Sequence, residues 1–141
     1  MKIIITGILL LINSTLAYAV DDPVLFIKKL PYKQVVKEIV LSRCLAQVAD
    51  ENSLFSVDAA HSSNALLEWV PFDIDNGNEK INALIDKYKN ITNAFHSSVK
   101  PKIQGVTLNC LRLYHSEELN KLSTQVIIGD PNRTWEQDNP Q

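Results

Sequence analysis

The chain reads VKEIVLSRCLAQV over residues 36–48, and this stretch decides the fold. Its apolar side chains follow the i, i+3, i+4, i+7 spacing of an amphipathic helix. They are Val36, Ile39, Val40, Leu41, Cys44, Leu45 and Val48. The stripe places Cys44 on the inward face, and Pro31 suits the first turn of such a helix. We therefore expect a long helix that begins near Pro31 and buries one face in a core.

Helical periodicity recurs along the rest of the chain, without strand-like alternation of any length. Further helices are expected at about Ser53–Trp69, around Ile81–Tyr88, around Val106–Tyr114 and after Ser116, which can cap the last of them. The sequence therefore predicts an all-α protein, a single compact bundle of about five helices. Small residues over 59–65 indicate that the second helix packs closely on another helix, in the same chain or in a second copy.

Two polar stretches separate the expected helices. Pro71–Glu79 combines proline and glycine with turn-forming Asp and Asn residues, and Asn93–Gly105 is polar with a proline before its glycine. We expect both to be exposed surface loops. Residues 20–30 and the tail beyond Gly129 have no clear periodicity, so we expect a loose lead-in and an irregular end.

The first nineteen residues have the three parts of a secretory signal peptide. A basic start at Lys2 precedes an apolar run that is short for a membrane span, and Ala17-Tyr18-Ala19 offers the small residues that a signal peptidase recognises. We expect cleavage between Ala19 and Val20, which leaves residues 20–141 as an exported helical domain, with no membrane association after cleavage. A buried N-terminal helix or an uncleaved anchor is the alternative.

Charge and cysteine content narrow the function. Lys and Arg number 14 against 16 Asp and Glu, so no basic field exists to bind nucleic acid. Two cysteines are too few for a zinc–thiolate cluster, and in an exported chain such a pair most simply forms one disulfide. We expect Cys44 and Cys110 to be joined, because both lie on apolar stripes. A thiol–disulfide enzyme is disfavoured, since no Cys-x-x-Cys pair occurs.

The sequence lacks a catalytic constellation. His61, His96 and His115 are scattered without the spacing of a helical metal pair, and no phosphate loop or nucleophile elbow is present. A cysteine nucleophile activated by His115 is the alternative to the disulfide. The acidic run over 73–79 lacks the spacing of an EF-hand. We expect no cofactor, no metal and no enzymatic activity, which leaves a binding protein.

Several segments resemble one family. They are LSRCLA over residues 41–46, LLE over 66–68, LNCLRLYHSEEL over 108–119, and PNRTW over 131–135 with QDN over 137–139. In this order they are similar to the periplasmic immunity proteins that neutralise type VI secretion peptidoglycan amidases, in the fourth amidase-immunity family. The resemblance covers about residues 31–139, and its most specific part is the Cys-x-x-x-Tyr-His-Ser segment with an upstream cysteine. Trp69-Val70-Pro71 departs from the smaller or more polar turn expected there.

The resemblance implies a helical homodimer that binds a cognate amidase, a cysteine hydrolase, and occludes its active-site cleft. It also implies a structural disulfide at Cys44 and Cys110. Toxin-contact residues are expected in the two loops, because binding residues concentrate on loops of a rigid scaffold. They are Asp73, Asp75, Asn76 and Glu79 in the first loop, and His96, Ser97, Ser98 and Lys100 in the second. Trp135 is either an interface anchor or a cover for the bundle.

Two other functions compete with this one. The first is the thiol–disulfide enzyme, which the absence of a Cys-x-x-Cys pair disfavours. The second is a non-catalytic, chaperone-like periplasmic protein, which would bind weakly and broadly, whereas an immunity protein binds one partner. For both sets of predicted contact residues, the alternative is that the two polar loops are only solvated connections between helices.

Overall fold

The structure is a computed structural model that describes residues 24–93 and 104–140. Its helices are α1 (Leu25–Lys28), α2 (Tyr32–Val48), α3 (Leu54–Leu67), α4 (Ile74–Lys89), α6 (Val106–Tyr114), α7 (Glu117–Gln125) and α8 (Trp135–Asp138). The all-α prediction is confirmed, and the five longest helices are those expected from the sequence. None of these described helices is both long and apolar enough to cross a membrane.

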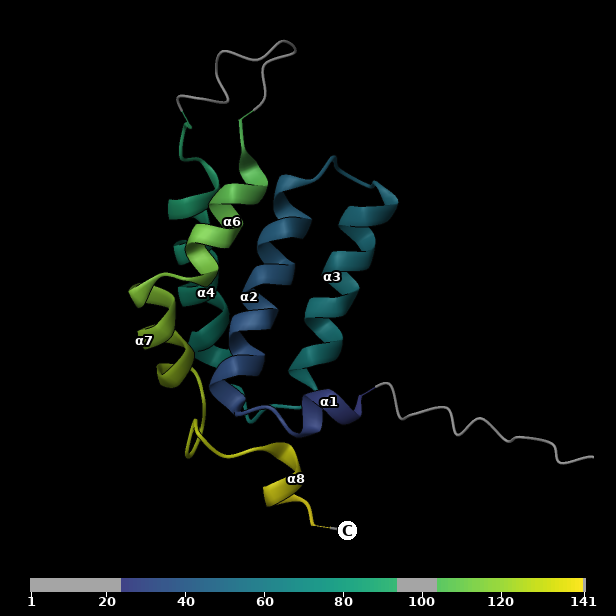
Figure 1. Ribbon diagram of the computed structural model, residues 1–141, viewed down its shortest axis with the longest axis vertical. Helices are drawn as coiled ribbons and strands as arrows, with labels where there is room; N and C mark the ends of the chain where they lie inside the picture. Colours follow the sequence, from purple (N-terminus) through teal and green to yellow (C-terminus); the bar gives the residue numbers. More distant parts are fainter. Residues whose placement is uncertain (1–23, 94–103, 141) are drawn as a thin grey trace, which may run out of the picture.

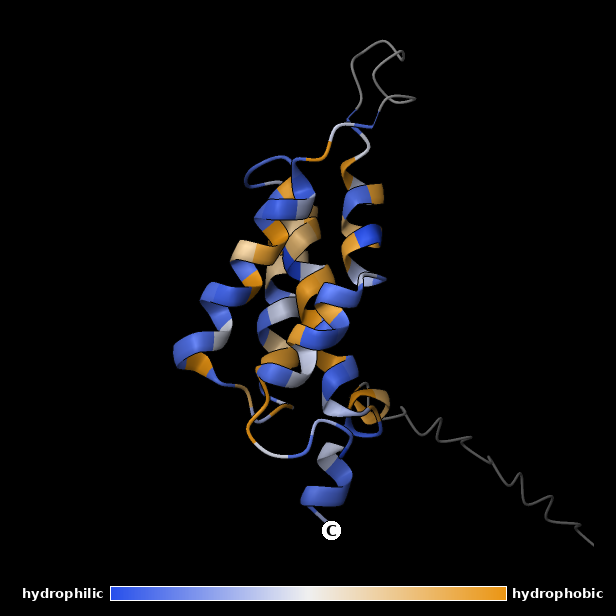
Figure 2. Cartoon of the chain, turned by 90° about the vertical axis from the view of Figure 1, so that its left-hand side faces the viewer, coloured by the Kyte–Doolittle hydropathy of each residue, from blue (hydrophilic) through white to orange (hydrophobic). Residues whose placement is uncertain are grey.

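Helix α2 lies at the centre, with α3 on one side and α4, α6 and α7 on the other (Figure 1). Val35 and Ile39 belong to a cluster with Ile27 and Leu66 on the α1–α3 side. The second and larger cluster contains Val36, Val40, Cys44, Ile81, Ile85, Cys110, Leu113, Leu119 and Val126. Figure 2 shows apolar residues where the helices meet and hydrophilic residues on the outward faces. The core is thus divided in two by α2, which is buried on both sides.

Short polar side chains define where three helices begin. Ser53, Asp73 and Ser116 each accept a hydrogen bond from a backbone N–H of the first turn, at 3.0, 3.2 and 3.1 Å. Such a cap contributes about 1 kcal/mol by satisfying a donor that the helix itself leaves unpaired. The expected cap at Ser116 is confirmed.

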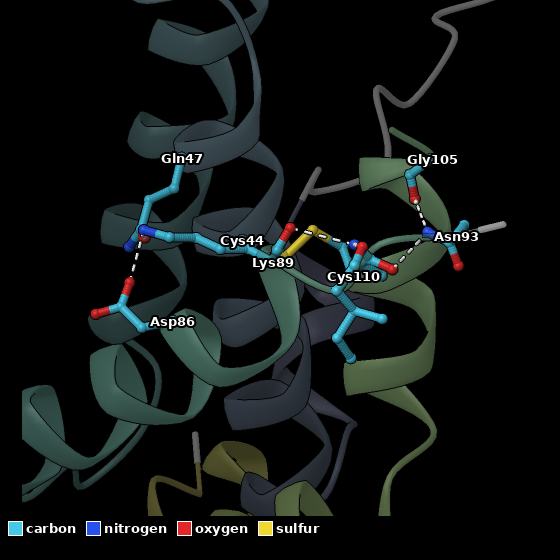
Figure 3. The surroundings of a disulfide bond; sticks show 9 residues. Cys44, Gln47, Asp86, Lys89, Asn93, Gly105 and Cys110 are labelled. Carbon is cyan, nitrogen blue, oxygen red and sulfur yellow. Dashed lines mark hydrogen bonds and ion pairs between the residues drawn. A yellow bond between two sulfur atoms is a disulfide. The ribbon is translucent and has the colours of Figure 1, made fainter. Parts of the chain in front are cut away.

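The predicted disulfide is present. Cys44 in α2 and Cys110 in α6 are bonded, with their Cα atoms 5.7 Å apart, and both residues are completely buried (Figure 3). The bond joins positions 66 residues apart and holds α6 against the central helix. Because neither sulfur is a free thiol, the alternative of a cysteine nucleophile at these positions is wrong.

The prediction of an exposed loop over Pro71–Glu79 is wrong beyond Asp73. Helix α4 begins at Ile74, so most of this stretch forms its first two turns. Gly77 is buried inside the helix, and a Cβ atom there would lie 2.6 Å from Cζ of Phe72. The glycine permits the Phe72 ring to pack closely, and the Asp and Asn residues are typical of a helix start as well as of a turn.

Residues 126–139, here called the C-terminal strap, cross the base of the bundle. The N–H groups of Tyr32 and Lys33 at the start of α2 donate to carbonyls of the strap at 2.9 and 3.0 Å. The N–H of Asp73, before α4, donates to the carbonyl of Val126 at 2.9 Å. The strap therefore satisfies donors that the helix starts leave unpaired.

The expectation of irregular ends is correct for residues 130–134 but wrong where α1 and α8 each form a helical turn. Helix α8 begins with a capping box between Thr134 and Gln137. Trp135 packs edge to face on Trp69, with ring centroids 5.2 Å apart, so it covers the bundle as one of the two alternatives proposed. Nζ of Lys28 in α1 lies 5.2 and 5.3 Å from these two rings, which joins the lead-in to the strap.

The strap also carries a pH-sensitive contact. The hydroxyl of Tyr32 donates to Asp138 at 2.8 Å, and burial together with this bond raises the pKa of Tyr32 to about 12. The bonds from Tyr32 and Arg133 hold the pKa of Asp138 below its usual value. The contribution of Asp138 is lost as the pH falls through that lowered pKa. The contribution of Tyr32 is lost as the pH rises from about 10 towards about 12.

Helix α3 is attached through a narrow face. Only Ala59, Ser63 and Leu66 are buried, and α2 is its main neighbour. The predicted close packing of small residues is confirmed, with the neighbouring helix in the same chain. The Oγ atom of Ser63 is buried and has no hydrogen-bond partner among the described residues.

We expect reduction of the disulfide to lower the melting temperature without abolishing helicity. In the chain-entropy model, a closed loop of this size contributes about 4 kcal/mol to the free energy of unfolding. Thermal denaturation followed by circular dichroism, with and without reductant, measures the effect. A variant with both cysteines changed to alanine is the control, since reductant should not change its melting temperature. Free alkylation of both thiols in the native exported protein would contradict the assignment.

Ser63→Ala is expected to stabilise the protein by about 1 kcal/mol, because it removes a buried hydroxyl that has no partner. Ser62→Ala is the matched control, since Ser62 is exposed on the same helix and the change in helix propensity is the same. Urea denaturation of both variants isolates the burial effect. Equal stability of the two variants would show that the Ser63 hydroxyl carries no penalty.

Candidate functional site

The structure describes one of the two predicted sets of contact residues. We call the end where α2 stops and α3 starts the apical end, and the opposite end the basal end (Figure 1). The basal end carries Asp73, Asp75, Asn76 and Glu79. The second set, His96, Ser97, Ser98 and Lys100, lies outside the described residues. Its neighbours Asn93 and Gln104 lie beyond the apical end of α4, whose length of about 24 Å separates the two ends.

Two of the basal residues have a structural role. Asp73 is the cap of α4, and its carboxylate accepts hydrogen bonds from the backbone and side chain of Asn76. These bonds, that from the Asn76 side chain first, lower the pKa of Asp73. Asp75 and Glu79 are exposed on the first turns of the helix. The basal set therefore offers two exposed carboxylates rather than a protruding loop.

The apical end exposes a group of apolar side chains at the start of α3. Leu54 is 91% exposed, Phe55 56% and Val57 45%. They are exposed because α3 buries only the stripe of Ala59, Ser63 and Leu66, which passes beside them. Apolar side chains gathered on a surface are typical of an interaction site. The sequence analysis did not predict this group of exposed side chains. Counting back from Leu66 in helical steps gives Ser63 and Ala59 as the buried stripe of α3, and Leu54 and Val57 do not lie on that stripe.

A groove lies next to these side chains. It has a volume of about 410 Å³ and is lined by Leu45, Val48, Ala49, Asp50, Ser53, Phe55, Val106 and Thr107. Its walls come from the end of α2, the start of α3 and the start of α6. We call this groove and the exposed Leu54, Phe55 and Val57 the apical surface.

The charges around the apical surface are acidic. Asp50 and Glu51 are exposed in the turn before α3, and Asp58 is exposed on its second turn. An apolar surface with carboxylates around it complements a partner that has an apolar contact area and a basic rim. The same charges repel an acidic partner.

A buried network of amides lies at the apical end, where α4 ends and α6 begins. The side-chain NH2 of Asn93 donates to the carbonyl of Gln104 at 2.9 Å and to Oδ1 of Asn109 at 3.0 Å. The NH2 of Asn109 donates to the carbonyls of Lys89 and Ile91 at 3.2 and 2.8 Å. Figure 3 shows Asn93 beside the disulfide, with its further bond to the carbonyl of Gly105. The network connects the residues on either side of 94–103.

The described residues hold no group of three His, Cys, Asp or Glu side chains that could bind a metal ion. His61 is exposed on α3. His115 caps the C-terminal end of α6, with its ring against Tyr114. What the described residues offer is therefore a surface for binding, with apolar area, charge and a rigid base.

Comparison with known proteins identifies the family. The model of a family described as Tai4, type VI secretion system amidase immunity protein, matches residues 34–123. The chain is 65% identical to one in a structure described as "New Type VI-secreted toxins and self-resistance proteins in Serratia marcescens". The TM-score is 0.80, and the match covers 86% of this chain and 95% of that one. No curated protein matches.

A second solved structure has the same fold. It is described as the effector–immunity system Tae4/Tai4 from Salmonella typhimurium, and its chain is 23% identical with a TM-score of 0.60. The match covers 70% of this chain and 91% of that chain. The family model spans well over half of the chain and includes both cysteines and most of the five longest helices. This chain therefore belongs to the Tai4 family of type VI secretion amidase immunity proteins.

Proposed function

We propose that this immunity protein binds a cognate peptidoglycan amidase in the periplasm and occludes the active-site cleft of that enzyme. Family membership supports an immunity role without enzymatic activity of its own. The apical surface supports a binding mechanism, because apolar side chains, a groove and carboxylates occur together there. This combination is the observation that carries the proposal.

Occlusion of a cleft needs an element that enters it and a surface that holds it there. In this proposal the segment with His96, Ser97, Ser98 and Lys100 enters the cleft, since its two ends adjoin the apical surface. Leu54 and Phe55 then pack on the rim of the cleft, and the nearby carboxylates face basic groups of the amidase. Asp75 and Glu79 at the basal end are the alternative contact.

The proposal includes export and dimerisation. The signal peptide over residues 1–19, cleaved between Ala19 and Val20, delivers the domain to the compartment where the amidase cuts cross-bridges. A homodimer is expected for this family. The small residues Ala59 and Ser63 do not form the dimer face, because both are buried against the same chain. The outward face of α3 remains available to a second subunit.

Co-expression with an exported amidase tests the function. We expect cells that export a candidate cognate amidase of the Tae4 type to survive when they also produce the full-length protein. Deletion of residues 2–19 should restore lysis, because the protein then stays in the cytoplasm. Lysis despite confirmed export and folding would contradict the pairing with that amidase. A chaperone-like protein would instead protect weakly and against unrelated periplasmic stresses.

Matched substitutions locate the contact surface. Leu54 and Ile74 are the first residues of α3 and α4, both follow a capping side chain, and they are 91% and 72% exposed. We expect Leu54→Asp to weaken amidase binding about tenfold or more, because a charge enters an apolar contact. Ile74→Asp should bind like wild type. An acid suits the first turn of either helix, so both variants should fold.

Affinities measured by calorimetry decide between the two ends of the bundle. Loss of binding in Ile74→Asp, with Leu54→Asp unaffected, would move the contact to the basal carboxylates. Loss in neither variant would show that neither helix start meets the amidase.

A further inference from the structure

A groove with basic walls lies between α4 and α7, on the side of α2 that faces away from α3 (Figure 1). Its volume of about 490 Å³ is the size of a site for a short peptide or another small ligand. Three apolar side chains and three lysines take part in its lining: Ala83, Leu84, Leu122, Lys80, Lys87 and Lys121. We call it the α4–α7 groove. It shares no lining residue with the groove at the apical surface.

The two helices run antiparallel along this groove. The N–H of Asp73, before α4, donates to the carbonyl of Val126, after α7. At the other end Lys87 of α4 donates to Glu118 of α7. Residues four and seven apart share a face of a helix, so Lys80 lies on the groove face of α4, one to two turns before Lys87. The basic side chains are therefore spread along the groove and not gathered at one end.

Only one of the three lysines is neutralised within the protein. Both carboxylate oxygens of Glu118 are occupied, one by Lys87 and the other by the hydroxyl of Tyr88 at 2.8 Å. Lys80 and Lys121 are exposed on opposite walls, and their ammonium groups form no hydrogen bond or ion pair with another described residue. The groove thus presents two uncompensated positive charges, although the chain as a whole has a net charge of −2.

The lining favours a narrow ligand that has carboxylates on either side of aliphatic groups. Carboxylates complement Lys80 and Lys121, and aliphatic groups complement Leu84 and Leu122 between them. A membrane surface fits less well, because interfacial binding needs protruding apolar side chains. None of the large apolar side chains that are exposed among the described residues lines this groove. The chemistry that fits is therefore that of a short acidic peptide.

We propose that the α4–α7 groove binds the acidic stem peptides of peptidoglycan and so holds the immunity protein at the cell wall, where the amidase acts. This inference rests on the proposed function, which places the domain in the periplasm. Stem peptides carry several free carboxylates separated by methyl and methylene groups, as the groove requires. Exposed ion pairs are individually weak, so the affinity for one peptide is modest. Because the two grooves share no residue, wall binding leaves the apical surface free for the amidase.

Binding to purified peptidoglycan sacculi tests the inference without the amidase. We expect the mature protein to sediment with sacculi, and less so as salt rises, because exposed charges are screened. A variant with both Lys80→Gln and Lys121→Gln should bind about tenfold more weakly. The matched control carries Lys29→Gln and Lys33→Gln, which remove the same charge from exposed positions outside the groove. It should bind like wild type.

A second pair of variants tests the groove itself at constant charge. Ala83 lines the groove and Asn82 does not, although both are exposed on α4. Ala83→Trp should block binding, because the indole fills the space between the helices, and Asn82→Trp should leave binding unchanged. The probe is a synthetic stem tetrapeptide, with sequence L-Ala–γ-D-Glu–meso-diaminopimelate–D-Ala, titrated while the amide resonances of α4 and α7 are followed by NMR.

Three results would overturn the inference. They are failure of wild type to bind sacculi, equal binding by groove and control variants, and binding to vesicles of phosphatidylglycerol and phosphatidylethanolamine with none to the tetrapeptide. The last would assign the groove to a membrane surface. Failure of the proposed function is seen separately, as full amidase activity in the presence of a protein that still sediments with sacculi.

Discussion

The burial of α2 on both sides is the constraint on which the rest of the structure depends. Val35 and Ile39 face one cluster while Val36, Val40 and Cys44 belong to another, so a single helix organises two separate apolar layers. The disulfide then fixes α6 to this helix across 66 positions. Because the centre of the bundle is rigid, its two ends can have different roles. The strap closes the basal end, and the apical end exposes apolar side chains.

The polar groups follow the same division. At the basal end the carbonyls of the strap satisfy the starts of α2 and α4, and Asp138 accepts the hydroxyl of Tyr32. At the apical end Asn93 and Asn109 are the polar groups held in the interior. One set of bonds closes the fold, and the other joins the end of α4 to the start of α6. The binding role assigned to the apical end agrees with this arrangement.

The sequence was sufficient for elements whose apolar spacing is regular, but not for features that depend on distant partners. The stripe from Val36 to Val48 predicted α2, its buried face and the cysteine pair. The stretch Pro71–Glu79 was wrongly predicted as a loop, because the residue types that cap helices also form turns. Local periodicity also gives no sign of the contact between Gly77 and the Phe72 ring. Helix α8 depends on Trp69 and on the start of α2, far away in sequence. The exposed Leu54 and the paired asparagines required the packing of α3 and α6 to be known.

Inhibition of the purified amidase measures the central claim most directly. Hydrolysis of peptidoglycan by the purified cognate amidase is followed while the mature domain is added, at an enzyme concentration well above the dissociation constant. The account predicts a linear fall in activity that reaches zero at one immunity subunit per amidase, as expected for occlusion of a single cleft. Full activity in the presence of excess folded, oxidised protein would contradict it.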